Sequence, residues 1–216
     1  MAIDREQPYP PWYFRREEES PDRFFYVEPR LVVHIDNHAI AAITGYFGRT
    51  LPKDGAVLDL LSSWRSHLPE GFLTGRLVGL GLNAAEMREN PQLDARVVHD
   101  VNADPRLPFD DAAFDAAVIT VSIQYLTRPV EVFQEVRRVL KEGAYLHVVY
   151  SNRMFPTKAV AIWKRLDDAG HSELIASYFA NAGGWERPEK LDISPQRTFY
   201  ADPVYVVAAR KKGPSS

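Results

Sequence analysis

Polar side chains follow the short apolar runs of this sequence, and they are its best candidates for chemistry. Asp59 lies in the apolar run 56–61, and Asp100 ends the run 96–100. Burying a carboxylate costs free energy unless it accepts hydrogen bonds. Asp59 is therefore predicted either to be held by neighbouring backbone N–H groups or to face a ligand. Further candidates follow the same apolar runs: Ser62, Ser63, Trp64, Asn83, Val101, Asn102 and Ser122.

Three other residues are candidates for a catalytic role. Tyr125 and Arg153 each come just after a predicted strand, where they can face an acceptor or anchor the surface. His34 is a candidate base, and the alternative is a structural histidine. The sequence contains no metal-ligand cluster, no nucleophile and base at a recognisable spacing, and no phosphate-binding glycine loop.

Apolar runs of strand length alternate with helical patterns, and these elements must position the candidates. Strands are predicted at 56–60, 76–82, 96–100, 114–120 and 145–150. Helices are predicted from Asp36 to about 51, over 84–88, over 129–140, from Thr157 to Gly170 and from Ser172 to Gly183. The alternation predicts a doubly wound α/β domain, in which ligands bind at the carboxyl ends of the strands. Two last strands, at 198–200 and 204–209, are predicted to close the sheet in part antiparallel.

Residues 1–30 differ in composition from the rest of the chain. They combine a charge run at 15–19 with five prolines and seven aromatic residues. Prolines and charges disfavour regular structure, whereas the aromatic residues favour burial. We predict an N-terminal arm that packs on the body, with a partly ordered extension as the alternative. Residues 31–212 are predicted to form one domain.

Composition excludes several classes of function. The chain of 216 residues suits one domain with a sizeable core. With 26 basic and 29 acidic residues, it has no general affinity for nucleic acid or anionic membranes. No cysteine is present, which removes disulfides, thiolate metal sites and cysteine nucleophiles. The N-terminus has no apolar run, and no stretch approaches membrane-spanning length, so a cytoplasmic protein is expected.

From about residue 30 to 150 the chain resembles the class I S-adenosylmethionine-dependent methyltransferases, particularly their small-molecule branch. The resemblance is carried by Val57–Leu60, Val78–Leu80, Asp100 with Leu107–Phe109, Phe114–Ala116 and Val136–Gly143. It implies a Rossmann-like, mostly parallel seven-stranded sheet with an antiparallel C-terminal hairpin. It also implies S-adenosylmethionine as the cofactor, with Asp59 organising its site and Asp100 bonding the adenine amino group.

Two features depart from the family pattern. The glycines that follow the first acid in the family are replaced by Leu61, Ser63 and Arg65. The acid that binds the ribose hydroxyls at the end of the second strand is replaced by Gly81. A hydrogen bond to a charged group contributes roughly 1.5–3 kcal/mol, so this loss weakens binding about 10- to 100-fold unless it is replaced. Asn83 is a candidate for a neutral contact, and Trp64 either shapes the pocket or caps the core.

The resemblance implies methyl transfer to a small-molecule nucleophile. His34 and Tyr125 are the first candidates for a base, and a thiol acceptor, with a pKa of about 8.5, needs only a weak one. Nucleic-acid methylation is disfavoured, because Ser122–Tyr125 stands where the DNA amino-methylating branch has an acid or amide and two prolines. The alternatives are a binding or regulatory protein without catalysis and non-methyl chemistry with the same cofactor. The acceptor and the oligomeric state stay open.

Overall fold

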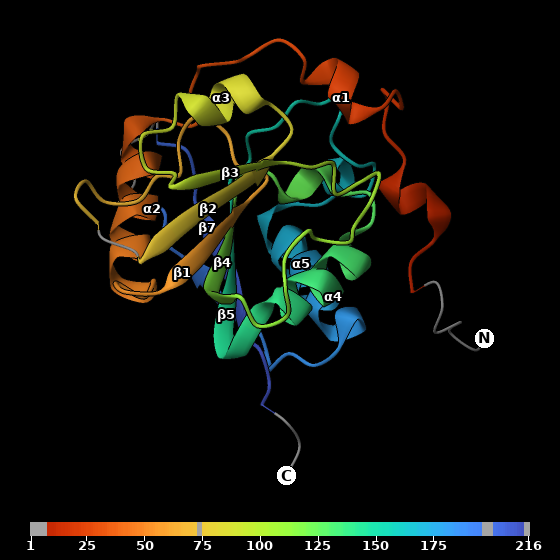
Figure 1. Ribbon diagram of the computed structural model, residues 1–216. Helices are drawn as coiled ribbons and strands as arrows, with labels where there is room; N and C mark the ends of the chain where they lie inside the picture. Colours follow the sequence, from red (N-terminus) through yellow and green to blue (C-terminus); the bar gives the residue numbers. More distant parts are fainter. Residues whose placement is uncertain (1–7, 73–74, 196–200, 214–216) are drawn as a thin grey trace.

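A seven-stranded sheet forms the centre of the computed structural model, which describes residues 8–72, 75–195 and 201–213 (Figure 1). The strands are β1 (Ala56–Leu60), β2 (Arg76–Gly81), β3 (Ala95–Val98), β4 (Phe114–Thr120), β5 (Leu140–Tyr150), β6 (Glu189–Asp192) and β7 (Tyr205–Arg210). Their order is β3-β2-β1-β4-β5-β7-β6. Strands β1 to β5 are parallel, and β7 pairs antiparallel with both β5 and β6. This confirms the predicted α/β fold with its antiparallel C-terminal hairpin.

Helices cover both faces of the sheet (Figure 1). α2 (Asn37–Thr50) packs on one face, and α4 (Pro129–Val139) and α5 (Asp168–Ala182) pack on the other. The short segments are α1 (Asp22–Phe25), α3 (Ala84–Arg88) and the 3₁₀ turns η1 (Pro11–Phe14), η2 (Ile123–Tyr125) and η3 (Trp163–Arg165). Each face of the sheet therefore has its own hydrophobic core.

The helices on the two faces form where capping and periodicity predict them. Asp36 caps α2, since its side chain accepts hydrogen bonds from the backbone of His38 and Ala39. Ile43 and Phe47, one turn apart on the buried face, are fully excluded from solvent. In α4, Pro129 occupies the first turn, where its missing N–H costs no hydrogen bond.

The predicted helix from Thr157 to Gly170 is wrong. Residues 157–167 contain only the turn η3, because backbone N–H groups that a helix would use bond to the arm instead: Ala161 to the Arg15 carbonyl and Ile162 to the Tyr13 carbonyl. A single helix, α5, then runs from Asp168. Gly170 does not break it, because its N–H in the first turn is capped by Asp167.

Other boundaries also differ from the prediction. The antiparallel partner of β7 is β6, and the predicted strand at 198–200 lies outside the described residues. All four residues of β6 are exposed, as in many charged edge strands, so no apolar alternation marks it. β3 ends at Val98, two residues early, and β5 begins at Leu140 because a register shift allows it to pair with Phe114.

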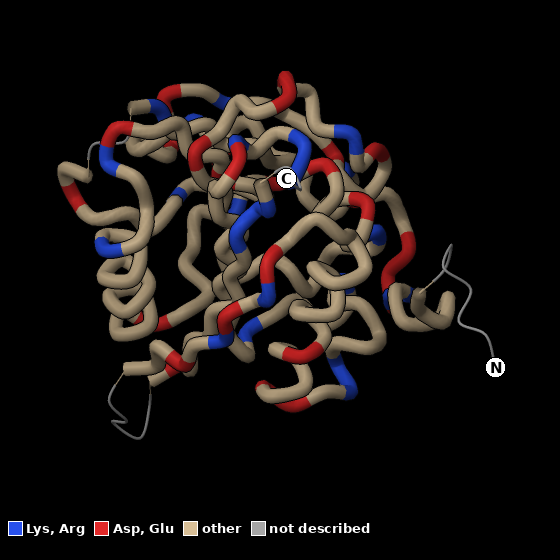
Figure 2. The backbone as a smooth tube through the Cα atoms, turned by 90° about the horizontal axis from the view of Figure 1, so that it is seen from below, with Lys and Arg blue, Asp and Glu red and all other residues tan. Residues whose placement is uncertain are grey.

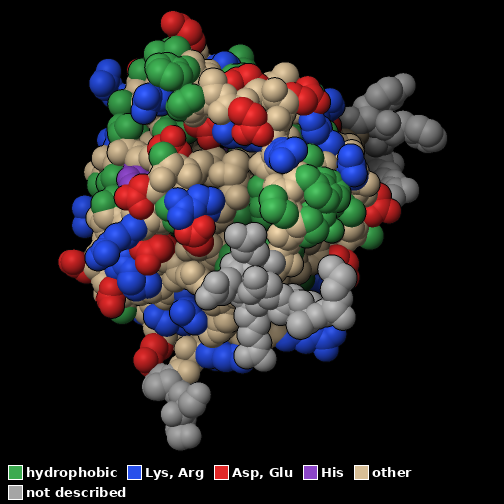
Figure 3. Space-filling model, turned by 90° about the vertical axis from the view of Figure 1, so that its right-hand side faces the viewer, with side chains coloured by type: hydrophobic (Ala, Val, Ile, Leu, Met, Phe, Trp, Pro, Cys, Tyr) green, Lys and Arg blue, Asp and Glu red, His purple; other side chains and the backbone are tan. Residues whose placement is uncertain are grey.

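The N-terminal segment from residue 8 passes over the end of the sheet before it enters α2 (Figure 1). The division at residue 30 between arm and domain stays a prediction. Basic and acidic residues are interspersed along the backbone (Figure 2), and the face in Figure 3 also mixes charged and apolar side chains. In the part of the chain that the structure describes, no helix is long and apolar enough to span a membrane.

Candidate active site

A cavity of about 180 Å³ lies at the carboxyl ends of β1, β2, β3 and β4, beneath the arm. The strand ends supply one part of its wall, and residues between Asp22 and Ile35 supply another. In the structure, we define the arm as the segment before α2, residues 8–36. Predicted site residues in the wall are His34, Asp59, Ser62, Ser63, Trp64, Asn83, Asp100, Val101, Asn102, Ser122 and Tyr125. The strand-end rule therefore brings most of the candidates to one place.

Two predicted site residues lie outside this wall. Arg153 has an exposed side chain, and its Nε donates to Asp202 Oδ1 at 2.7 Å. This geometry corresponds to the surface-anchor alternative. Gly81 is buried at the end of β2, where the backbone of Ser62 in the loop after β1 lies against it.

Asp59 is held by hydroxyl groups. Its Oδ2 accepts hydrogen bonds from Ser62 Oγ at 2.7 Å and Ser66 Oγ at 2.6 Å. The residue is 3% exposed, and burial raises the pKa of its carboxyl group to about 6, while the two hydroxyl bonds oppose the shift. The sequence predicted either that backbone N–H groups hold this carboxylate or that it faces a ligand. In the structure the carboxylate lines the cavity, and serine hydroxyls rather than backbone N–H groups donate to it.

The loop after β1 carries backbone strain in place of glycine. Leu61 has a φ of 61°, in the left-handed region that costs an L-residue about 1–2 kcal/mol. Val121, at the end of β4, has a φ of 51° and is β-branched, which makes this conformation rarer still. Both residues line the cavity. Strain of this kind clusters at binding and active sites.

The same loop closes the end of β2. The backbone N–H of Ser62 donates to the Leu80 carbonyl at 2.8 Å, which draws the loop onto the strand. A Cβ built on Gly81 would lie 2.1 Å from the Ser62 carbonyl oxygen. No side chain fits there unless the loop moves, so an acid at this position is excluded by the backbone itself.

Asn83 has both ends of its amide engaged. Its Oδ1 accepts hydrogen bonds from the backbone of Ala85 and Glu86 and so caps α3. Its Nδ2 donates to the carbonyls of Tyr26 and Val27 in the arm. The side chain predicted as a neutral ligand contact therefore ties α3 to the arm.

Glu86 is a wall residue that the sequence reasoning missed. It is 7% exposed, and its carboxylate accepts hydrogen bonds from Ser63 Oγ at 2.6 Å and from the Arg30 backbone N–H at 2.7 Å. The signal was present, because an Asn followed three residues later by Glu has the spacing of a capping box. Here the glutamate bonds the β1 loop and the arm.

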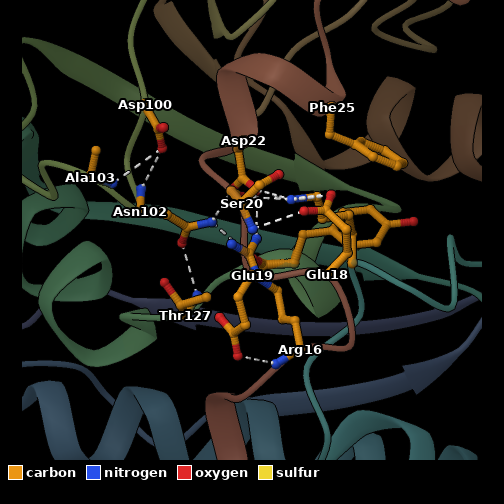
Figure 4. Close-up of polar contacts among 12 residues, drawn as sticks. Arg16, Glu18, Glu19, Ser20, Asp22, Phe25, Asp100, Asn102, Ala103 and Thr127 are labelled. Carbon is orange, nitrogen blue, oxygen red and sulfur yellow. Dashed lines mark hydrogen bonds and ion pairs between the residues drawn. The ribbon is translucent and has the colours of Figure 1, made fainter.

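Asp100 and Asn102 shape the loop after β3 (Figure 4). Asp100 Oδ1 accepts hydrogen bonds from the backbone of Asn102 and Ala103, at 3.0 and 3.1 Å. Asn102 Nδ2 donates to the Tyr125 carbonyl and to Asp22 Oδ2. Its Oδ1 accepts the Thr127 N–H. Asn102 therefore joins the β3 loop to the β4 loop and to the arm.

A buried ion cluster clamps the arm onto the body (Figure 4). The fully buried Lys158 Nζ lies 2.7 Å from Glu18 Oε2 and 3.2 Å from Asp22 Oδ1. Asp22 also pairs with Arg16 at 2.6 Å, and the Ser20 carbonyl accepts a further bond from Lys158. The hydrogen bonds from Lys158 and Ser20 lower the pKa of Glu18 to about 2. All the acids of this cluster come from the arm.

Aromatic side chains form the wall beneath the arm. The rings of Tyr125 and His34 both contact Phe155, with centroids 6.0 and 4.9 Å away. The Arg30 guanidinium lies 4.5 Å from the Phe25 ring centroid, a cation–π distance. Tyr125 Oη accepts the Phe155 N–H at 2.8 Å. Burial raises the pKa of Tyr125 and lowers the pKa of His34, so both are neutral near pH 7.

Comparison with known proteins agrees with this geometry. Residues 67–148 match the family model described as a methyltransferase domain. The match spans β2, β3, β4 and most of β5, and it supports the resemblance to the class I S-adenosylmethionine-dependent methyltransferases. S-adenosylmethionine is the cofactor that this resemblance implies. No curated protein matches its sequence.

Solved structures share the fold of this chain at low sequence identity. A Haloferax volcanii protein in complex with the Trm112 methyltransferase activator is 15% identical, with a TM-score of 0.61, covering 83% of this chain and 92% of its own. The [4+2]-cyclase SpnF is 16% identical, with a TM-score of 0.55 and 80% of each chain covered. Geranyl diphosphate C-methyltransferase from Streptomyces coelicolor, solved with S-adenosylhomocysteine, is 14% identical, with a TM-score of 0.53 and 79% of each chain covered.

The cavity wall has polar groups of the kind that S-adenosylmethionine requires. Asp59 in β1 and Asp100 after β3 supply hydrogen-bond acceptors on either side of β2. Thr120 Oγ1 is buried in the wall and has no hydrogen-bond partner among the described residues, which leaves a donor and acceptor for a ligand. Within the described ranges, no group of three or more His, Asp or Glu side chains is arranged to bind a metal ion.

Proposed function

We propose that the methyltransferase transfers a methyl group to a small molecule enclosed between the arm and the strand ends. The observation that carries this proposal is the arm itself. It lies across the cavity, contributes Tyr26, Arg30 and His34 to the wall, and is held by the buried Lys158 cluster. An acceptor that must fit beneath such a segment is small, which favours a metabolite over a polymer.

The chain's own residues act mainly by positioning. When bound, S-adenosylmethionine supplies a methyl group that its sulfonium already activates. Asp59, Asp100 and Thr120 are proposed to hold the cofactor at the strand ends, and the aromatic wall holds the acceptor. The arm would exclude water and hold the acceptor nucleophile next to the methyl group of the cofactor. Such alignment supplies several kcal/mol without a strong base.

His34 is the better of the two candidate bases. Its lowered pKa keeps the imidazole neutral near pH 7, so it can accept the proton that the nucleophile loses. The raised pKa of Tyr125 keeps its phenol protonated. Because Tyr125 Oη accepts a backbone hydrogen bond, its own hydrogen stays available to orient the acceptor. A thiol, whose pKa is about 8.5, is compatible with so weak a base.

Binding without catalysis is the second candidate function, and one observation favours it. The side chain at Leu61 and the closed end at Gly81 narrow the region where the family backbone approaches its cofactor. A protein of this kind binds S-adenosylmethionine or its product as a signal and transfers nothing.

Calorimetry on the full chain tests cofactor binding. Both S-adenosylmethionine and S-adenosylhomocysteine are expected to bind, and Asp59→Asn is expected to weaken binding by about 10-fold or more, since hydrogen bonds to a charged group are lost. The matched control is Asp54→Asn, an exposed acid at the other end of β1. No heat from either ligand at millimolar concentration contradicts the proposal.

Product analysis then separates the two functions. A panel of small thiols, amines and phenols is incubated with S-adenosylmethionine, and mass spectrometry follows the methylated product and S-adenosylhomocysteine. Transfer that requires His34, with a slower rate in His34→Gln, supports catalysis. Tight binding with no transfer to any acceptor of the panel favours the binding function.

A further inference from the structure

The cofactor's ribose lacks a carboxylate partner at the end of β2. The backbone of Ser62 occupies the space into which a side chain at Gly81 would extend, at 2.1 Å from an added Cβ. Asn83, two residues later, uses its side-chain amide for hydrogen bonds with the α3 backbone and the arm. Neither residue is therefore free to bind a sugar hydroxyl pair, although the strand end faces the cavity.

None of the other acids in the cavity wall has a free acceptor site on both carboxylate oxygens, which a pair of hydroxyl groups requires. Asp22 is paired with Arg16 and Lys158 in the buried ion cluster. Asp100 organises its own loop through two backbone N–H groups. Asp59 receives both of its serine hydroxyls on one oxygen, beneath the β1 loop.

Glu86 has the geometry that a vicinal diol requires. It lies on α3, the helix that begins three residues after β2, and its side chain lines the cavity. Each of its carboxylate oxygens accepts one hydrogen bond, Oε2 from Ser63 Oγ and Oε1 from the Arg30 N–H. A carboxylate has about four lone-pair sites, so one acceptor site remains on each oxygen. The two donors also fix the orientation of the carboxylate.

We propose that Glu86 binds the two ribose hydroxyls of the cofactor, taking over from the closed end of β2. This inference rests on the proposed function, since it needs the cofactor in this cavity. Acidic side chains also bind ribose hydroxyls in the dinucleotide sites of doubly wound sheets. The contacts with Ser63 and Arg30 make the β1 loop and the arm part of the same subsite.

Calorimetry with two ligands and two variants tests this role. The ligands are S-adenosylhomocysteine and its 2′,3′-dideoxy analogue, and the variants of the full chain are Glu86→Gln and the control Glu89→Gln, an exposed residue at the end of α3. The wild type is expected to bind the dideoxy analogue about 10- to 100-fold more weakly than S-adenosylhomocysteine. Glu86→Gln is expected to lose most of that preference, whereas Glu89→Gln keeps it.

Each outcome separates the two proposals. No binding of S-adenosylhomocysteine by the wild type overturns the proposed function and the role of Glu86 together. Binding with an unchanged preference in Glu86→Gln overturns only the role of Glu86. If that variant fails to fold, the wild type alone still tests the proposal. Equal affinity of the wild type for the two ligands would show that no side chain binds the ribose hydroxyls, and it would overturn the proposal.

Discussion

At the scale of single residues, Asp59 couples the chemistry of the site to stability. Its carboxyl group is buried among serine hydroxyls, which are weaker partners than a cation. Burial therefore outweighs the hydrogen bonds and raises the pKa to about 6. A carboxyl group with a raised pKa is stabilised in its neutral form in the folded state. Its contribution to the free energy of unfolding must then depend on pH.

We predict that this contribution is present below about pH 4 and is lost as the pH rises through about 6. In that window the folded protein retains a proton that the unfolded chain has released. The free energy of unfolding of the wild type, relative to Asp59→Asn, should fall by up to about 3 kcal/mol between pH 4 and 7. Urea unfolding across this range measures both free energies of unfolding. Because the buried histidines contribute equally to the two proteins, their pH dependence cancels in the difference. A difference that is flat, or that rises with pH, contradicts the assignment.

Gly81 is the residue at which the backbone leaves least room. Gly81→Ala places a methyl group against the Ser62 carbonyl, so the β1 loop has to move. We expect a loss of about 1–3 kcal/mol in the free energy of unfolding, typical of overpacking, together with weaker S-adenosylhomocysteine binding. The control is Gly45→Ala in α2, where the new Cβ meets only the flexible end of Arg49. That helix-interior change should instead stabilise by about 0.5–1 kcal/mol, and chemical denaturation compares the two.

At the scale of elements, the arm and the segment after β5 hold each other in place through hydrogen bonds and ion pairs. Residues 13–18 and 157–162 exchange backbone hydrogen bonds, and Lys158 is buried among acids of the arm. A fully buried ammonium depends on these partners, because an unpaired charge in such a place is strongly unfavourable. The arm is thus joined to the body through both backbone and charge.

Two lysines of this segment allow a matched comparison. Lys158→Met leaves acids of a buried cluster without their partner, and we expect a loss of about 3–5 kcal/mol. Lys164 pairs with Glu17, whose side chain is 61% exposed, so Lys164→Met should cost less than about 1 kcal/mol. Urea unfolding gives the two free energies, and limited trypsin digestion should cut the arm faster in Lys158→Met. Equal effects of the two substitutions would contradict the role of the Lys158 ion cluster in holding the arm on the body.

At the scale of the whole molecule, the cavity is closed from two sides by parts far apart in sequence. Trp64 Nε1 of the β1 loop donates to the Val32 carbonyl of the arm at 3.0 Å, and Glu86 bonds both parts. A ligand held between them should stabilise the closed arrangement of both. Its effect should not extend to the exposed edge strand β6.

Hydrogen exchange measures this joint response. On binding S-adenosylhomocysteine, amides of residues 26–35 and of 61–67 are expected to gain protection together, because a ligand that binds the closed state suppresses local opening. Amides of 189–192 serve as the internal control and should not change. Protection confined to 61–67 shows that the arm takes no part in the site.

Much of the fold was predictable because it depends on local patterns. Periodicity and capping placed the five parallel strands, α2 and α4, and the rule for strand ends brought Asp59, Asp100 and Ser122 to one cavity. These features follow from residues close together in the chain. The methyltransferase resemblance rests on the same segments.

Tertiary structure alone decided the character of the site. Arg153 pairs with Asp202, Lys158 with acids of the arm, and Ser62 with the end of β2, across sequence separations that no local pattern records. The same cause removed the predicted helix at 157–170, whose N–H groups bond to the arm. The sequence by itself predicted a ligand site at these strand ends. Folding decided which side chains reach it, because burial and closure depend on contacts between distant residues.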